Sequence, residues 1–336
     1  MLIWWLVMAA EQLSWNNSLP CNVPETIGEP KGFVMDPMGK IWLVDRDANL
    51  LVWDRQGALV FELGGRGQGP GEFNIKNQEL IITRDAKNII VCDSNRVSYF
   101  SFDGQFLRSV NKPAELQKRF KYFLRTPSGF LVAYNRYHGA SAQGKLMNRV
   151  LLVDVNLSPR KVLLEERDWR WSKTPAGGWH SRPYAARLVL SVDEKGIWLA
   201  RSDDNMVTSY GFDGIRRNSF RVKLPLAKVD LDDLENLRSS FFRGNRSAND
   251  TITFPEYDSQ LDFMLPLEDD SMFVFQYQIS TGLHRGVVVE TKDGTVQKQI
   301  VTQLGENGRV MASQGKLLAI SISDDGVYDI RRISQL

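Results

Sequence analysis

Six short apolar segments, each ending in a polar residue, recur along the chain. They occupy residues 41–45, 89–93, 130–134, 197–201, 272–276 and 317–321. Their polar ends lie 48, 41, 67, 75 and 45 residues apart, and three of these intervals match the roughly 40–50 residues of a four-stranded propeller blade. The pattern therefore predicts six copies of one β-sheet unit.

Each apolar segment is predicted to be the second strand of a hairpin. A turn rich in Gly, Pro, Asp or Lys precedes it, as at residues 36–40, and an earlier apolar run precedes that turn, as at residues 33–35. Two further strands follow, joined in several units by an Asp-Gly pair such as Asp103-Gly104. Because Gly adopts a positive φ at little cost, Asp-Gly favours a tight turn between antiparallel strands. The unit is therefore a predicted four-stranded antiparallel meander.

The units are expected to close into a ring. A single meander cannot cover both of its faces, so neighbouring units must pack side by side around a centre. The last unit supplies only three strands, within residues 310–333, and we expect its fourth strand to come from residues 22–27. The predicted fold class is all-β: a six-bladed β-propeller over residues 21–336, closed by that N-terminal strand and carrying one short helical insertion at residues 226–242.

A glycine-rich run lies between the first and second units. It reads Gly64-Gly65-Arg66-Gly67-Gln68-Gly69-Pro70-Gly71-Glu72-Phe73 and resembles the inter-blade motif of NHL-repeat-like six-bladed β-propellers. The motif is sharp over residues 33–111 and degenerate afterwards. The resemblance implies binding in or around the central channel, with activities in the family that range from scaffolding to lyases and hydrolases. A fold alone does not choose among these functions.

The N-terminus carries a short apolar run that ends in Ala9-Ala10 before Glu11. This is the core and cleavage pattern of a secretory signal, so residues 1–20 are predicted to form a signal-like apolar segment and the protein to be periplasmic or extracellular. The positively charged start of such a signal is missing, which keeps a cytoplasmic protein as the alternative. No segment is long enough to predict a transmembrane span.

Charge is distributed unevenly, although the formal net charge is only +2. Residues 108–187 contain sixteen Lys or Arg and five acids, whereas residues 250–293 contain nine acids and two bases. In a radial fold these blocks become separate sectors, and an anionic ligand or acidic partner would be steered to the basic sector. The alternative is that both sectors are solvated surfaces that keep the protein soluble.

The polar ends of the six apolar segments are the first candidate site. They are expected at one axial level near a channel mouth, where they would bind a small polar ligand: Asp45, Asp93, Tyr134, Arg201, Gln276 and Ser321. The alternative is that the aspartates accept hydrogen bonds from their own turns.

A basic, aromatic insert is the second candidate site. It would bind a protein partner through Trp169, Arg170, Trp171, Trp179, His180, Arg182 and Tyr184. Trp, Tyr and Arg bury large areas at interfaces and dominate their binding energy. The alternative is that these aromatics cover the side of a blade.

Catalytic residues cannot be assigned from the sequence. A zinc site would require His138, His180 and His284 to converge, and a calcium site could use Asp45, Asp93 and Asn74. Neither spacing is diagnostic, so we expect no cofactor and favour a non-enzymatic binding or scaffold protein. A metal-dependent hydrolase or lyase at the channel is the alternative.

The expected partner is a protein or a small polar or anionic ligand. Nucleic-acid binding is not expected, because the predicted export argues against it, although a basic face with interleaved aromatics would permit it. We expect a monomer unless the chain belongs to a larger assembly.

Overall fold

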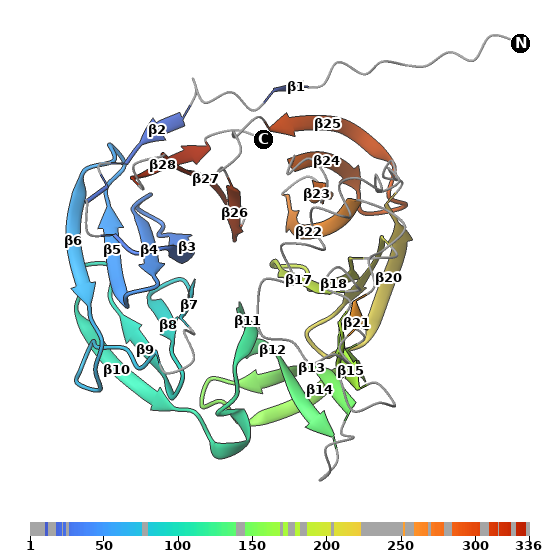
Figure 1. The fold of residues 1–336 in the computed structure, drawn as a ribbon, viewed down its shortest axis with the longest axis horizontal. Helices are drawn as coiled ribbons and strands as arrows, with labels where there is room; N and C mark the ends of the chain where they lie inside the picture. Colours follow the sequence, from blue (N-terminus) through green and yellow to red (C-terminus); the bar gives the residue numbers. More distant parts are fainter. Residues whose placement is uncertain are drawn as a thin grey trace, which may run out of the picture.

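Six β-sheets stand around a common centre (Figure 1). The computed structural model describes residues 11–12, 18–21, 23–24, 27–75, 80–138, 145–168, 171–173, 179–181, 187–202, 205–222, 251–252, 259–267, 270–278, 284–302, 309–314, 316–323 and 327–333. Each sheet is an antiparallel meander of four strands running outwards from the centre, apart from additions contributed by the N-terminal segment. The predicted six-bladed β-propeller is confirmed.

The first three blades follow one another along the chain. Blade 1 contains β3 (Pro30–Met35), β4 (Ile41–Asp45), β5 (Asn49–Trp53) and β6 (Leu59–Gly64). Blade 2 contains β7 (Ile81–Arg84), β8 (Ile89–Cys92), β9 (Arg96–Phe100) and β10 (Phe106–Asn111). Blade 3 contains β11 (Phe120–Thr126), β12 (Gly129–His138), β13 (Lys145–Asp154) and β14 (Pro159–Arg167).

The remaining blades complete the circle. Blade 4 contains β17 (Leu188–Val192), β18 (Ile197–Arg201), β19 (Met206–Tyr210) and β20 (Arg216–Arg221). Blade 5 contains β22 (Ser259–Pro266), β23 (Ser271–Gln278), β24 (His284–Glu290) and β25 (Val296–Thr302), with β1 (Glu11–Gln12) added parallel to β25. Blade 6 contains β26 (Arg309–Ser313), β27 (Lys316–Ile322) and β28 (Tyr328–Ile333), and its outer strand is β2 (Ser18–Pro20).

The N-terminal strand closes the last blade, as predicted, but from a different segment. β2 pairs antiparallel with β28, with Leu19 opposite Arg332, so the strand lies at Ser18–Pro20 and the prediction of residues 22–27 was wrong. The Cys21 N–H still donates to the Ile330 carbonyl of blade 6, at 2.9 Å, and by Gly28 the chain is bonded to blade 1. The described residues between these two contacts, 23, 24 and 27, are not part of a strand. Pro20 is tolerated because β2 is an edge strand.

Apolar side chains fill the gap between each pair of neighbouring blades. Six separate clusters of buried residues correspond to the six blade interfaces, including the interface between blades 6 and 1. In β4, Trp42 and Val44 pack toward blade 2, whereas Leu43 packs toward blade 6. Successive residues of a strand point to opposite faces, so the second strand of each blade is buried on both sides. That burial explains its continuous apolar sequence.

Helical structure is minimal in the described part of the chain. It consists of one 3-10 turn, Ala114–Leu116, in the connector from blade 2 to blade 3. The predicted helical insertion at residues 226–242 lies outside the described residues. Among the residues that the structure describes, no helix is long and apolar enough to cross a membrane.

Candidate functional site

The six predicted ligand-binding residues lie on one face of the disc. In the pairing of each innermost strand with the second strand, Asp45 lies opposite Pro30, Tyr134 opposite Phe120 and Arg201 opposite Leu188. The face on which the innermost strands begin is called here the proximal face. The innermost strands lie between these residues and the channel, and none of the six is among the described residues that line it.

Asp45 is completely buried and its carboxylate is occupied by its own turn. Oδ1 accepts the backbone N–H groups of Asp47 and Asn49, at 2.9 and 2.8 Å. Oδ2 accepts the N–H of Gly28 at 2.8 Å and the side-chain amide of Asn49 at 2.9 Å. Four hydrogen bonds account for the acceptor capacity of a carboxylate. This geometry matches the alternative in which the aspartate holds its turn.

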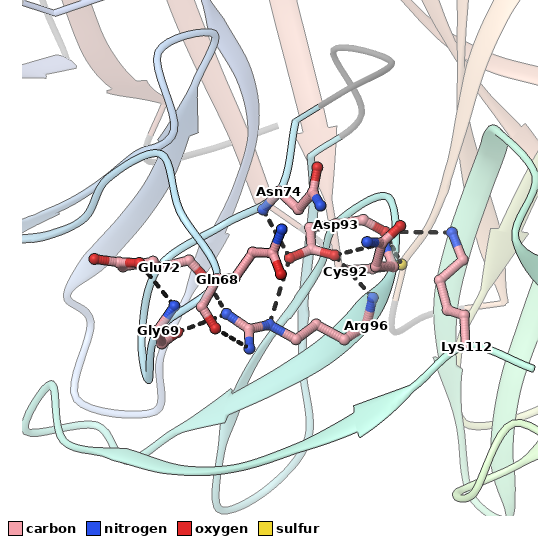
Figure 2. A network of polar contacts seen from close by, with 9 residues as sticks. Gln68, Gly69, Glu72, Asn74, Cys92, Asp93, Arg96 and Lys112 are labelled. Atoms are coloured by element: carbon pink, nitrogen blue, oxygen red, sulfur yellow. Dashed lines mark hydrogen bonds and ion pairs between the residues drawn. The ribbon is translucent and has the colours of Figure 1, made fainter.

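Asp93 repeats this arrangement in blade 2 (Figure 2). Oδ1 accepts the N–H groups of Asn95 and Arg96, at 2.7 and 2.8 Å. Oδ2 accepts the N–H of Asn74 at 3.0 Å and lies 3.7 Å from Nε of Arg96. Asn74, a conceivable calcium ligand by sequence, thus contributes its backbone N–H to Asp93.

Arg96 organises the glycine-rich run that resembles an inter-blade motif (Figure 2). Its guanidinium donates to the carbonyls of Gln68, Gly69 and Glu72, at 2.9, 2.6 and 2.8 Å. The Glu72 carboxylate in turn accepts the N–H of Gly69 at 2.7 Å. The run is therefore a connector folded around one arginine, and nothing in this geometry resembles a phosphate-binding loop. Neither residue was predicted from the sequence: Glu72 lies within the motif, whereas Arg96 lies 23 positions after its last residue.

The other predicted ligand-binding residues have different surroundings. Tyr134 is 3% exposed, and its hydroxyl accepts a hydrogen bond from Arg149 at 3.4 Å. Arg201 lies 3.8 Å from Glu166 and so connects blade 4 to blade 3. Ser321 is partly buried in β27. Gln276 is placed in β23, but its side chain lies outside the described residues.

Blade 3 contains a buried polar cluster that was not predicted from the sequence. Asp168 is completely buried, and Oδ2 accepts the side-chain amide of Asn135 at 2.9 Å and lies 3.4 Å from Nζ of Lys121. Lys121 also donates to Oδ1 of Asn148 at 2.8 Å. In the sequence, Asp168 is one of five acids in the basic stretch 108–187, and nothing distinguishes it from the others. In the structure it fixes the end of β14, immediately before the predicted partner-binding insert.

The central channel has a volume of about 300 Å³ and is lined by the innermost strands of all six blades. Much of its wall is apolar. Its charged lining residues among those described are Lys31, Lys121 and Arg125, and no Asp or Glu lines the described wall. Lys31 is paired with Glu29 at 2.6 Å. Cationic side chains at the wall favour a polar or anionic ligand over a bare metal cation.

Metal-binding geometry is not found among the described side chains. They contain no group of three or more His, Cys, Asp or Glu residues arranged to hold a metal ion. The side chains of His138, His180 and His284 lie outside the described residues, so the alternative of a zinc site formed by these histidines stays untested.

Two strands of the insert and one strand from the connection between blades 4 and 5 form a small sheet outside the six blades. β15 (Trp171–Lys173) pairs antiparallel with β16 (Trp179–Ser181), and β16 pairs parallel with β21 (Thr251–Ile252). Trp171 lies opposite Ser181 and Trp179 opposite Lys173, while β15 contacts β13 of blade 3. Trp169, Arg170, Arg182 and Tyr184 lie outside the described residues, as do the side chains of Trp171, Trp179 and His180.

The match to a protein-family model agrees with the fold. Residues 32–165 match a family described as a 6-bladed beta-propeller. No curated protein matches the chain significantly. Among solved structures, a luciferin-regenerating enzyme is similar at 12% identity and a TM-score of 0.49, over 95% of this chain and 96% of that one. The computationally designed Ika8 protein is similar at 10% identity and a TM-score of 0.41, over 94% and 98%. The chain is a six-bladed β-propeller that resembles this 6-bladed beta-propeller family over its first three blades.

Proposed function

We propose that this chain is a non-enzymatic binding or scaffold propeller that docks a protein partner through the insert between blades 3 and 4. The observation that carries the proposal is the extra sheet formed by β15, β16 and β21. The six blades close their ring without this sheet, because every innermost strand already contacts its two neighbours. An element that closure does not need is available for recognition.

The base of the insert is well positioned for this role. Asp168, the residue before the insert, is fixed by Asn135 and Lys121 within blade 3. On the far side, the N–H of Arg187 donates to the hydroxyl of Ser202 in blade 4, at 2.8 Å. A binding element held at both ends by a rigid scaffold loses less conformational entropy when it binds. The composition of the insert, rich in Trp and Arg, is that of an interface centre.

Charge supports an acidic partner. The insert belongs to the stretch 108–187, which carries sixteen bases and five acids. A partner with an acidic surface would be steered to this sector, and its binding would weaken as salt increases. Export by the predicted signal-like segment would mean that this partner is periplasmic or extracellular.

A small polar ligand at the channel mouth is a second candidate, for which one observation speaks. Lys31 and Lys121 line the channel where the innermost strands begin, and no described lining residue is acidic. That wall suits a compact anion. The aspartates at the proximal face would then support the mouth without contacting the ligand.

The test is capture of the partner by full-length protein in the organism that encodes it. The variant Trp169→Ala/Trp171→Ala/Trp179→Ala should lose the captured partner while its thermal midpoint changes by less than about 2 °C. A control removes three exposed apolar side chains elsewhere, Met38→Ala/Leu107→Ala/Val327→Ala, whose wild-type residues are 62%, 50% and 54% exposed. Unchanged capture in the tryptophan variant would refute the docking site, and loss of the fold would show that the tryptophans are core residues.

A further inference from the structure

A groove of about 750 Å³ lies beside blade 3, away from the channel. One wall is the connector from blade 2, which includes Leu116, Lys118 and Arg119. The other walls come from β12, β13 and β14, which contribute Tyr134 and Arg149 among others. Its volume is within the range of small-molecule sites and is more than twice that of the channel.

The groove is strongly basic. Five cationic side chains line it: Lys118, Arg119, Arg149, Arg160 and Lys161. Glu115 is the one acidic lining residue among those described. Arg149 is paired with Glu165 at 3.0 Å and Arg160 with Asp154 at 2.9 Å. Within the part of the chain that the structure describes, Lys118 and Arg119 form no ion pair and are exposed at the rim. Their charges are therefore not neutralised by a described carboxylate.

The connector that carries Lys118 and Arg119 is held in place by a buried lysine. Lys112 is buried, and its Nζ donates to the carbonyls of Asp93 and Lys118, both at 3.2 Å. The same ammonium lies 3.9 Å from the centre of the Phe120 ring. The rim of the groove is thus tied to the core between blades 2 and 3, so its charges are presented on an ordered backbone.

Hydrogen-bond donors and an apolar wall lie side by side inside the groove. Tyr134 accepts a bond from Arg149, and its own hydroxyl hydrogen has no acceptor among the described residues. It can therefore donate to a bound anion. Pro159 and Val162 line the same groove, and Val162 is 43% exposed. Leu116 and Leu151 lie behind this wall and are buried in the core.

We propose that this groove binds a small amphipathic anion, a phosphate or carboxylate group attached to an apolar body. Arg149, Lys118 and Arg119 would hold the charged oxygens, because guanidinium and ammonium groups make charge-assisted hydrogen bonds to them. Val162 and Pro159, which line the groove and are exposed, would contact the apolar body. No described residue of the insert and no described residue of the channel wall lines this groove, so the proposal does not depend on the function proposed above.

Calorimetric titration of the full chain with three probes tests the proposal. The probes are 1-naphthyl phosphate, 1-naphthylacetate and inorganic phosphate, which separate the charged group from the apolar body. We expect one equivalent of a naphthyl compound to bind at least about tenfold more tightly than inorganic phosphate. If 1-naphthyl phosphate binds more tightly than 1-naphthylacetate, the ligand's charged group is a phosphate; the reverse order indicates a carboxylate. Binding of none of the probes, or equal binding of all three, would overturn the proposal.

Two variants locate the binding. Lys118→Glu/Arg119→Glu should weaken naphthyl binding at least about tenfold, and Val162→Ser should weaken naphthyl binding without changing the affinity for phosphate. The control Arg46→Glu/Lys87→Glu makes the same change in net charge at two exposed positions of blades 1 and 2. An equal loss in this control would show that only the overall field attracts the probe and would refute the groove. The triple tryptophan variant should bind the probes normally, which separates this test from that of the insert.

Discussion

The carboxylate of Asp93 accepts the backbone N–H of Asn74 at 3.0 Å, although 19 positions separate them in the sequence. Asp45 accepts the N–H of Gly28 in blade 1 in the same way, at 2.8 Å, and the hydroxyl of Ser202 accepts the N–H of Arg187 in blade 4. In each case a side chain at the end of the second strand, or one position after it, fixes the segment that precedes an innermost strand. The polar strand ends thus order the chain between blades.

This arrangement predicts that Asp93→Ala destabilises the protein by about 2–4 kcal/mol, because one buried and two partly buried N–H groups lose their acceptor. Urea unfolding measures the change. Asp103→Ala, at an exposed turn position of blade 2, is the control and should change stability by less than about 0.5 kcal/mol. If Asp93→Ala instead kept full stability and lost only ligand binding, the aspartate would be a ligand-binding residue.

The Lys121–Asp168 pair should be strongly coupled. Lys121→Met leaves a buried carboxylate without its cation and should cost about 2–4 kcal/mol, whereas adding Asp168→Asn should recover part of that loss. A double-mutant cycle by urea unfolding tests this, and we expect a coupling free energy between Lys121 and Asp168 of at least about 1 kcal/mol. The exposed pair Arg66–Asp47, 2.7 Å apart, is the control, with an expected coupling below about 0.5 kcal/mol. Equal coupling in the two cycles would contradict a structural role for Asp168.

Two neighbouring glycines should differ in their tolerance of alanine. Gly64 and Gly65 both have positive φ, +91° and +110°, so either substitution should cost about 1–2 kcal/mol of backbone strain. At Gly64 the new Cβ would also lie 2.6 Å from the Ala48 carbonyl oxygen, whereas at Gly65 nothing lies within 4 Å. We expect Gly64→Ala to lose about 1–3 kcal/mol more than Gly65→Ala in thermal unfolding. Equal losses would mean that the connector is not packed as described.

Burial raises the pKa of the Cys21 thiol to about 12, with smaller contributions from Asp329 and Asp54. The unfolded thiol ionises near pH 8.5 and the folded one does not, so the folded state retains more protons as the pH rises. The stability that Cys21 contributes is therefore complete below about pH 8.5 and falls up to about pH 12, by at most about 1.4 kcal/mol per unit.

Urea unfolding at pH 8 and pH 10 measures how the free energy of unfolding depends on pH. The variant Cys21→Ser lacks the thiol and therefore its contribution to this dependence. The stability difference between wild type and variant should shrink at the higher pH. An unchanged difference, or a Cys21 that reacts with a thiol reagent in the native protein at pH 8, would contradict the buried position.

The non-enzymatic proposal predicts that purified full-length protein holds far less than one equivalent of zinc or calcium. Elemental analysis before and after dialysis against a chelator gives the answer. Stoichiometric metal that is lost on replacing His138, His180 and His284 would favour the alternative hydrolase or lyase.

The strand pattern could be predicted because burial on both faces leaves a continuous apolar run, as in β4 and β8. The position of β2 could not, because three residues at a sheet edge need no distinctive sequence. In blade 4 the predicted site residue was Arg201, but the side chain that performs the role of Asp93 is the next one, Ser202. Ser202 could not be recognised from the sequence, because its role depends on the exact residue at which the second strand of blade 4 ends.

The candidate sites were harder to predict for a related reason. Asp168 and Arg96 look like surface charges in the sequence, yet one is buried and the other is surrounded by carbonyl groups. The carbonyl partners of Arg96 and the partners of Asp168 lie 24 to 47 positions away, so the folded blade or connector brings them together. The groove likewise combines a connector with three strands of the next blade.

Cross-linking mass spectrometry of full-length protein bound to its captured partner tests the central claim, which is that this propeller binds through the sector around blade 3. We predict that partner cross-links concentrate on Lys145, Lys161 and Lys173, and that the triple tryptophan variant lacks them. Cross-links concentrated on Lys40, Lys87 and Lys316, which lie in blades 1, 2 and 6, would contradict the claim.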